Sequence, residues 1–131
     1  MDLWHQYQQV VFISYQPFAK DSSFAIISAA NPAGNNTPLG FNLCRNMALA
    51  AALHQSGVRY RKIIGAAPDK SFQEPSWAVF CSRPEATSIA MGWQQNALYW
   101  IEQGELWLLP ALMQQEEKAL GSFQQRLILA S

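Results

Sequence analysis

The stretch FAIISAANPAGNNTPLGFNLCRN, residues 24–46, decides the fold of this chain. Its first seven residues, 24–30, are almost continuously apolar, which predicts a strand covered on both faces and therefore central in a sheet. Asn31 and Pro32 end the strand, because a residue before proline is pushed out of helical geometry. A loop rich in Gly, Asn and Pro extends to Gly40. Polar side chains gathered between a strand end and a helix start are typical of sites in small α/β domains.

Outward from this stretch, the chain alternates between paired strands and helices. A long helix is expected over residues 41–55, where strong helix formers precede Ser56 and Gly57. A shorter helix is expected from Arg83, capped by Ser82, and a short one near the start, capped by Asp2. The other predicted strands cover residues 10–15, 58–65, 76–81, 96–101 and 105–109. After Pro110 the sequence favours helix through residue 120, whereas residues 122–129 fit helix or strand.

These elements predict a single α+β domain over residues 1–131. We expect a mixed or antiparallel sheet of about five or six strands, with one long helix and one or two shorter helices packed on it. A chain of 131 residues can bury a substantial core without a metal or a disulfide.

Composition excludes several classes of function. Nine basic residues balance nine acidic ones, so no long-range field attracts nucleic acid or anionic membranes. No apolar run is long enough to span a bilayer. His5 and His54 are too distant to form a zinc site, and Cys44 and Cys81 are far apart, which favours reduced thiols. We expect a cytoplasmic monomer or weak homo-oligomer, with a small-molecule or protein partner and without cofactor, metal, nucleic-acid or membrane binding.

The long helix places polar and apolar side chains on one stripe. At 100° per residue, Asn42, Arg45 and Asn46 align with Leu49 and Leu53. The apolar end predicts that the stripe faces the core, so its polar end needs partners there. One interpretation is that these groups bind an anionic or amide-bearing ligand. The other is that the two Asn residues hold the preceding loop and Arg45 pairs with Glu74.

Three further polar residues are candidates for the same site. Asn31 could contact a substrate beside Arg45, or it could pin the loop. Glu74, placed just before a strand, is the best candidate general acid or base, although an ion pair is an alternative role. Gln95 closes the second helix and could line the same cleft. The candidate site is therefore Asn31, Asn42, Arg45, Asn46, Glu74 and Gln95.

The order of short motifs resembles a bacterial domain-of-unknown-function family of short stand-alone proteins. The shared features are the strand end A-x-N-P (residues 29–32), N-x-x-R-N (42–46), the glycine–tyrosine step (57–60), Gly65, E-P-S (74–76) and Q-N (95–96). The resemblance covers about residues 24–108. One departure is Ala30, where the family often has a bulkier aromatic, which could open space beside Asn31. The resemblance implies one compact domain with Asn31, Asn42, Arg45, Glu74 and Gln95 in a single site, but no chemistry.

Three functions are compatible with these features of the sequence. The first is a binding or interaction domain with a polar cleft around Arg45 that suits an anionic or amide-bearing ligand or a peptide. The second is an enzyme, with Glu74 as general acid or base and Arg45 stabilising a developing oxyanion. The third is an interaction protein that uses exposed aromatics and a sheet edge.

Overall fold

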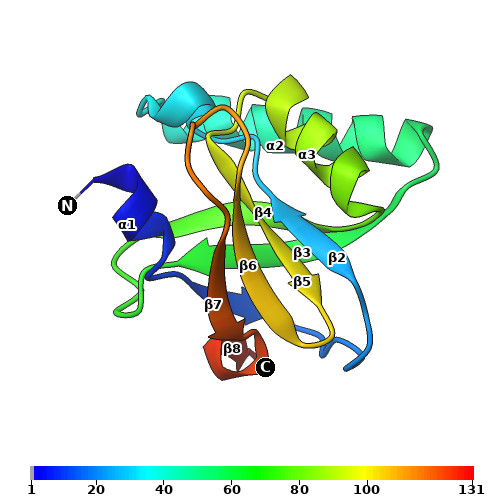
Figure 1. Ribbon diagram of the computed structural model, residues 1–131. Helices are drawn as coiled ribbons and strands as arrows, with labels where there is room; N and C mark the ends of the chain where they lie inside the picture. The colour runs from blue at the N-terminus through cyan, green and yellow to red at the C-terminus, as the bar shows by residue number, and fades with distance from the viewer. Residues whose placement is uncertain (1) are drawn as a thin grey trace.

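The computed structural model describes residues 2–131, which form one α+β domain around a single mixed sheet of eight strands (Figure 1). The strand order is β7-β6-β5-β2-β4-β3-β1-β8. The helices are α1 (Leu3–Tyr7), α2 (Leu39–Gln55) and α3 (Arg83–Gly92), with short 3-10 turns at Pro32–Gly34 and Gln124–Arg126. The strands are β1 (Val11–Ser14), β2 (Phe24–Ile27), β3 (Arg59–Ala66), β4 (Gln73–Phe80), β5 (Ala97–Glu102), β6 (Glu105–Pro110), β7 (Lys118–Ser122) and β8 (Leu127–Leu129).

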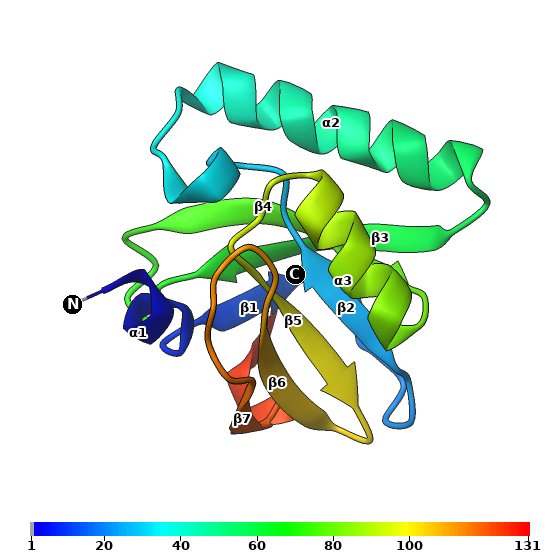
Figure 2. The same ribbon diagram turned by 45° about the horizontal axis from the view of Figure 1, so that its top comes forward.

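The central position predicted for residues 24–30 is confirmed, because β2 lies between β4 and β5. All four residues of β2 are buried, as a strand covered on both faces requires. Side chains alternate between the faces, so Ala25 and Ile27 face α2 and α3, whereas Phe24 and Ile26 face the opposite side. Figure 2 shows α2 and α3 together on one side of the sheet.

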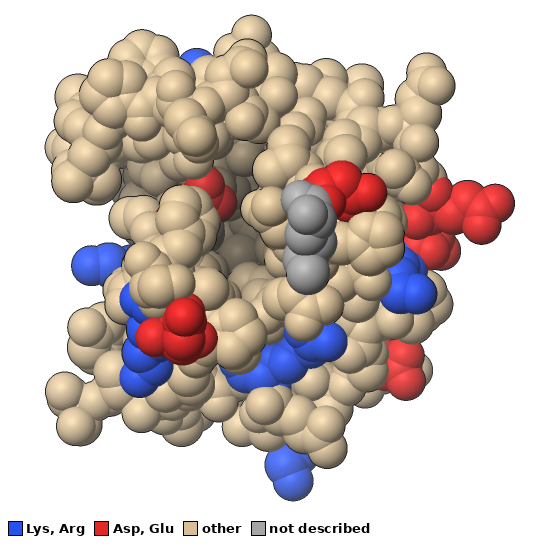
Figure 3. Space-filling view, turned by 90° about the vertical axis from the view of Figure 1, so that its left-hand side faces the viewer, with Lys and Arg blue, Asp and Glu red and all other residues tan. Residues whose placement is uncertain are grey.

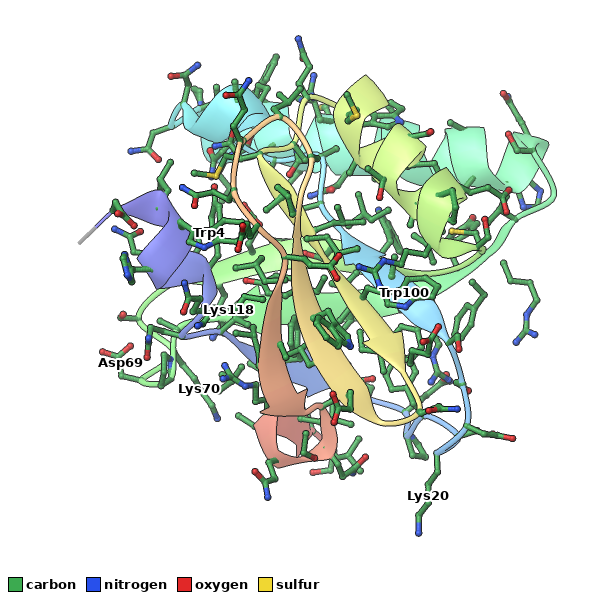
Figure 4. The ribbon with its side chains drawn as sticks, viewed as in Figure 1. Trp4, Lys20, Asp69, Lys70, Trp100 and Lys118 are labelled. Carbon is green, nitrogen blue, oxygen red and sulfur yellow. The ribbon has the colours of Figure 1, made fainter. Side chains whose placement is uncertain are left out.

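Sequence-based expectations for the helices are confirmed with small shifts in their ends. The side chain of Asp2 caps α1 by accepting from the His5 amide. Ser82 caps α3 in a capping box with Glu85. The stripe predicted on α2 faces inward, and its members Asn46, Leu49 and Leu53 are buried. Trp100 of β5 joins the core under these helices, whereas Lys20, Asp69 and Lys70 extend outward from turns (Figure 4).

The opposite face of the sheet is concave and filled with aromatic rings at one end. Phe24 stacks on Phe18 with 4.5 Å between ring centroids, and Phe123 meets both rings edge-on. Phe12 contacts Phe123 and Tyr99 in the same group. This aromatic cluster closes one end of the concave face and leaves the other end for the cavity described below.

The C-terminal segment imposes the curvature of the sheet. β7 and β8 are its two edge strands, yet only residues 123–126 connect them. Five residue steps reach at most about 18 Å, whereas the edges of a flat eight-stranded sheet would lie roughly 34 Å apart. The sheet must therefore curl into a half-barrel, and Arg126 holds the closure by donating to the Gln8 and Val10 carbonyls.

This segment is where the sequence-based prediction was wrong. Residues 111–120 favoured helix, but the chain is irregular to residue 117 and then forms β7. Residues 122–129, for which helix and strand were both open, contain a 3-10 turn and β8. Because β7 and β8 add to the strands expected from the sequence, the sheet has eight strands instead of five or six. Within residues 2–131, no helix is long and apolar enough to cross a membrane.

Candidate functional site

A cavity of about 530 Å³ lies at the open end of the half-barrel, bounded by the concave face and by residues of α1. Figure 3 shows this side of the molecule hollowed, with acidic atoms visible in the hollow. The apolar part of the wall includes Val10, Phe12, Ile26, Leu98 and Tyr99. The polar part includes Tyr7, Ser28, Asn31, Asn36, Glu74, Ser76, Gln95 and Asn96. A concave, largely apolar volume of this size with convergent polar groups is typical of a small-molecule site.

Glu74 is the acidic residue of the cavity wall. It lies in β4 opposite Gly65 of β3, so its side chain points into the concave face. Burial raises the pKa of the Glu74 carboxyl from 4.5 to about 7, and the neighbouring Asn31 and Ser28 side chains only partly oppose this effect. The Asn31 contact is long, with 3.5 Å between Nδ2 and Oε1. Within residues 2–131, no ion pair neutralises this carboxyl.

Asn31 is held at the rim by several hydrogen bonds. Its Oδ1 accepts from the Thr37 amide at 3.1 Å and from Asn42 Nδ2 at 3.0 Å. The backbone N–H of Asn31 donates to Asn42 Oδ1 at 2.9 Å. Asn31 thus holds the loop in place, which is one of the two roles expected for it. Its side-chain Nδ2 also points to the Glu74 carboxyl.

The rim also contains strained backbone. Asn31, Ala33 and Gln94 have positive φ values of 48°, 55° and 61°, which side-chain-bearing residues rarely adopt. The Ala33 amide donates to the Gln94 carbonyl at 2.6 Å, so the two strained segments are tied together. Such strain costs of order 1–3 kcal/mol per residue and clusters at functional sites. Ala33 and Gln94 are the chain neighbours of the cavity residues Gly34 and Gln95, so this strain borders the cavity wall.

On the α1 and β5 side, the polar wall is built by two tyrosines and two amides. The Tyr99 hydroxyl donates to the Tyr7 carbonyl at 2.6 Å, and Asn96 Nδ2 donates to the Tyr7 hydroxyl at 3.3 Å. Gln95, one of the predicted site residues, does line the cavity, and its Nε2 donates to the Ala30 carbonyl at 3.1 Å. These bonds fix the wall and attach α1 to it.

The remaining predicted site residues lie behind the cavity. Arg45 Nε donates to the Ala29 carbonyl at 2.6 Å and Nη2 to the Trp93 carbonyl at 2.7 Å. Asn46 accepts from the Ala29 amide at 2.8 Å and donates to the Pro75 carbonyl at 3.0 Å. Asn42 holds the loop through its bonds to Asn31. The structure therefore brings Asn31, Glu74 and Gln95 together in the cavity wall, while Asn42, Arg45 and Asn46 fix the backbone that carries them.

Two sequence-based interpretations are corrected by this geometry. Arg45 was considered as an ion-pair partner of Glu74, but it donates to backbone carbonyls instead. Glu74 was placed before a strand that began at residue 76, whereas β4 begins at Gln73 and includes it. Pro75 does not end β4, although proline has no N–H to donate to a neighbouring strand. The pairing of β2 with β4 ends at Trp77, so no hydrogen bond from residue 75 to β2 is needed.

Tyr7, Ser28 and Tyr99 were not among the residues proposed from the sequence. Ser28 could have been found from the sequence, because it continues the alternation of Phe24 and Ile26 on one face of the predicted central strand. A hydroxyl at such a buried position is costly without a hydrogen-bond partner, so it is a candidate for a functional role. Tyr7 and Tyr99 had none, since they meet only when α1 folds over β5. Within the described residues, no group of three His, Cys, Asp or Glu side chains is arranged to hold a metal ion.

We expect Asn46→Ala to destabilise the protein strongly. Asn46 is 4% exposed. Its removal leaves the Ala29 amide without a partner in the interior and leaves the Pro75 carbonyl with only the longer bond from the Ser28 hydroxyl at 3.3 Å. The loss is expected to be about 2–4 kcal/mol in the free energy of unfolding. Urea denaturation measures it, with Met47→Ala as control because the neighbouring Met47 is 69% exposed. Equal stability of the two variants would contradict the assigned role.

Glu74 predicts a specific pH dependence of stability. Because its folded pKa of about 7 lies above its unfolded value, protonation stabilises the fold; this contribution is complete below about pH 4.5 and is lost as pH rises through 7. Glu74→Gln should therefore gain stability relative to the parent between pH 5 and pH 8, by up to about 3 kcal/mol. Urea denaturation at both pH values measures the difference. The control is the exposed Glu116→Gln, and a difference that is constant with pH would refute the prediction.

Comparison with known proteins identifies a family for the region that builds this site. A search of curated proteins and a search of solved structures each give no match. A family described as "Protein of unknown function (DUF3293)" matches residues 27–98, more than half of the 131 residues. The match runs from the end of β2 to the start of β5 and includes Asn31, Glu74 and Gln95. The chain belongs to this DUF3293 family.

Proposed function

We propose that the protein is a binding domain that takes a small, partly apolar molecule into the cavity of its half-barrel. The observation that supports this most is the Glu74 carboxyl, exposed to a cavity of about 530 Å³ without a cationic partner in the described residues. A buried carboxyl without compensation destabilises the fold, so a cavity that presents such a group favours a ligand that supplies the compensation.

The proposal keeps the binding role expected from the sequence and changes its position. The expected cleft was centred on Arg45 and suited an anionic or amide-bearing ligand. The Arg45 guanidinium is engaged by the Ala29 and Trp93 carbonyls, and the cavity on the other side of this backbone presents a carboxyl. An amide-bearing ligand still fits this cavity, whereas an anion would be repelled by Glu74 at neutral pH.

We also infer a cytoplasmic location. Cys44 and Cys81 are free, which suits a reducing compartment. A protein partner stays a further proposal, for which α2 offers the exposed side chains of Leu39, Phe41, Leu43 and Met47.

Gly65→Val should abolish ligand binding without loss of stability. Gly65 pairs with Phe12 and Glu74, so an added side chain would enter the cavity on the same face as theirs. A Cβ there would meet its nearest atoms at 3.8 and 3.9 Å, which is ordinary contact, and valine favours strands. Ligand-observed nuclear magnetic resonance with a library of partly apolar fragments measures the binding.

The matched control is Gly40→Val, since Gly40 has open space around it and is not part of the cavity wall. We expect fragments to bind the parent and Gly40→Val, and to lose binding by at least roughly tenfold in Gly65→Val. If the parent binds no fragment, or if Gly65→Val binds them equally well, the proposed site is wrong.

The second candidate is an enzyme that moves a proton with Glu74. A carboxyl with a pKa of about 7 is matched to general acid–base catalysis at neutral pH. The carboxylate would remove a proton from a carbon beside a carbonyl and return it, while the Tyr7 hydroxyl, held by Asn96, would donate to the developing oxyanion.

This candidate is tested by deuterium exchange. A panel of small cyclic ketones is incubated with the protein in D₂O, and deuterium at the α-carbon is measured by nuclear magnetic resonance. Catalysed exchange should rise with pH through about 7 and disappear in Glu74→Gln, whereas Glu116→Gln should keep it. Exchange at the uncatalysed rate would leave ligand binding as the function and reject the enzyme.

A further inference from the structure

The cavity wall has one charge sign. Its described residues include Glu74 and contain no Lys, Arg or His. Arg45, the nearest cation expected from the sequence, donates to the Ala29 and Trp93 carbonyls behind the wall. Arg126 donates to the carbonyls of Gln8, Val10 and Leu120. A ligand therefore meets a carboxyl without competition from a protein cation.

The hydrogen-bonding groups around Glu74 have partners that leave the carboxyl under-satisfied. Asn31 gives it one long bond of 3.5 Å, and the Ser28 hydroxyl also donates to the Pro75 carbonyl at 3.3 Å. The Ser76 hydroxyl donates to the Glu74 backbone carbonyl at 3.2 Å. A carboxylate can accept several hydrogen bonds, so a ligand with several donors on a small head would complete its environment.

The rest of the lining includes apolar and aromatic residues. Phe12, Ile26 and Tyr99 line the cavity from the concave face of the sheet, and the Tyr99 hydroxyl donates its proton to the Tyr7 carbonyl. The cavity lining thus combines one carboxyl group with apolar and aromatic residues of the same concave face.

We propose that the ligand is a small amine, bound as its ammonium ion by the Glu74 carboxylate, with an aromatic or aliphatic body lying against Phe12, Ile26 and Tyr99. This inference rests on the proposed function and specifies its ligand class. An ammonium supplies a positive charge and three donors in a compact group, which is the combination that the wall lacks.

Binding of such an ion requires the ionised carboxyl. The titratable groups facing Glu74 are Tyr7 from α1 and Tyr99 from β5, and burial raises the pKa of both hydroxyls. Both stay neutral below pH 8, and an alkylammonium stays charged. The affinity for an amine should therefore rise between pH 6 and pH 8 through Glu74 alone.

The test uses three probes of similar shape with the full-length protein: benzylamine, benzyl alcohol and benzoate. Dissociation constants are measured by ligand-observed nuclear magnetic resonance at pH 6 and pH 8 for the parent, Glu74→Gln and Gly65→Val. We expect benzylamine to bind at least roughly tenfold more tightly than benzyl alcohol at pH 8, and benzoate not to bind. Glu74→Gln should remove the preference for the amine and its pH dependence while keeping the alcohol, and Gly65→Val should remove both.

The outcomes separate this inference from the proposed function. If benzyl alcohol binds as tightly as benzylamine and both are lost in Gly65→Val, the cavity binds ligands but the amine assignment is wrong. If benzylamine binds Glu74→Gln as tightly as the parent, the assignment is also wrong. If none of the probes binds and the fragment library gives no ligand, both the inference and the proposed function fail.

Discussion

The rest of the structure depends on the point where β2 stops pairing while its neighbour continues. β2 pairs with β4 only as far as Ile27 opposite Trp77, although β4 extends back to Gln73. Backbone groups beyond this point are buried and need partners, because an unsatisfied one costs about 1–3 kcal/mol. Side chains of α2 replace the missing ladder: Asn46 bonds to the Ala29 amide and the Pro75 carbonyl, and Arg45 bonds to the Ala29 carbonyl. Helix, strand end and β4 are thereby locked into one unit, and the early end of β2 leaves room for the cavity.

This unit explains why polar residues so close in sequence have different roles. The helix side chains face the strand end from the α2 side and are consumed by backbone groups. Glu74 and Asn31 emerge on the concave side of the same backbone, one in β4 and the other just after β2. The Arg45 guanidinium and the Glu74 carboxyl could have neutralised one another. They lie on opposite sides of the same backbone, which separates them. The separation leaves the carboxyl uncompensated, so burial dominates its pKa.

Much of the fold followed from local pattern in the sequence, whereas the site depended on long-range geometry. The continuous apolarity of β2, the helix formers of α2 and the cap at Ser82 each act within a few residues, so the central strand and both main helices were predicted. β7 and β8 were not, because short edge strands form only when the sheet curls and offers them partners. Of the residues proposed for the site, Asn31, Glu74 and Gln95 line the cavity, but sequence spacing could not say on which side of the strand end Arg45 lies.

The empty volume is encoded by the choice of small side chains at one end of the concave face. At the other end Phe18, Phe24 and Phe123 fill the same surface with stacked and edge-on rings. The inward positions change from Phe24 and Ile26 in β2 to Ser28 and Ala30 in the segment that follows it, and β3 and β4 contribute Gly65 and Ser76. Protein interiors normally reach close packing, and a larger residue at any of these positions would reduce the void. One end of the half-barrel is thus tightly packed, whereas the other end contains a cavity, a buried carboxyl and three residues with strained backbone beside it. Fold stability alone would favour larger side chains that fill the cavity, so this combination is typical of a ligand site.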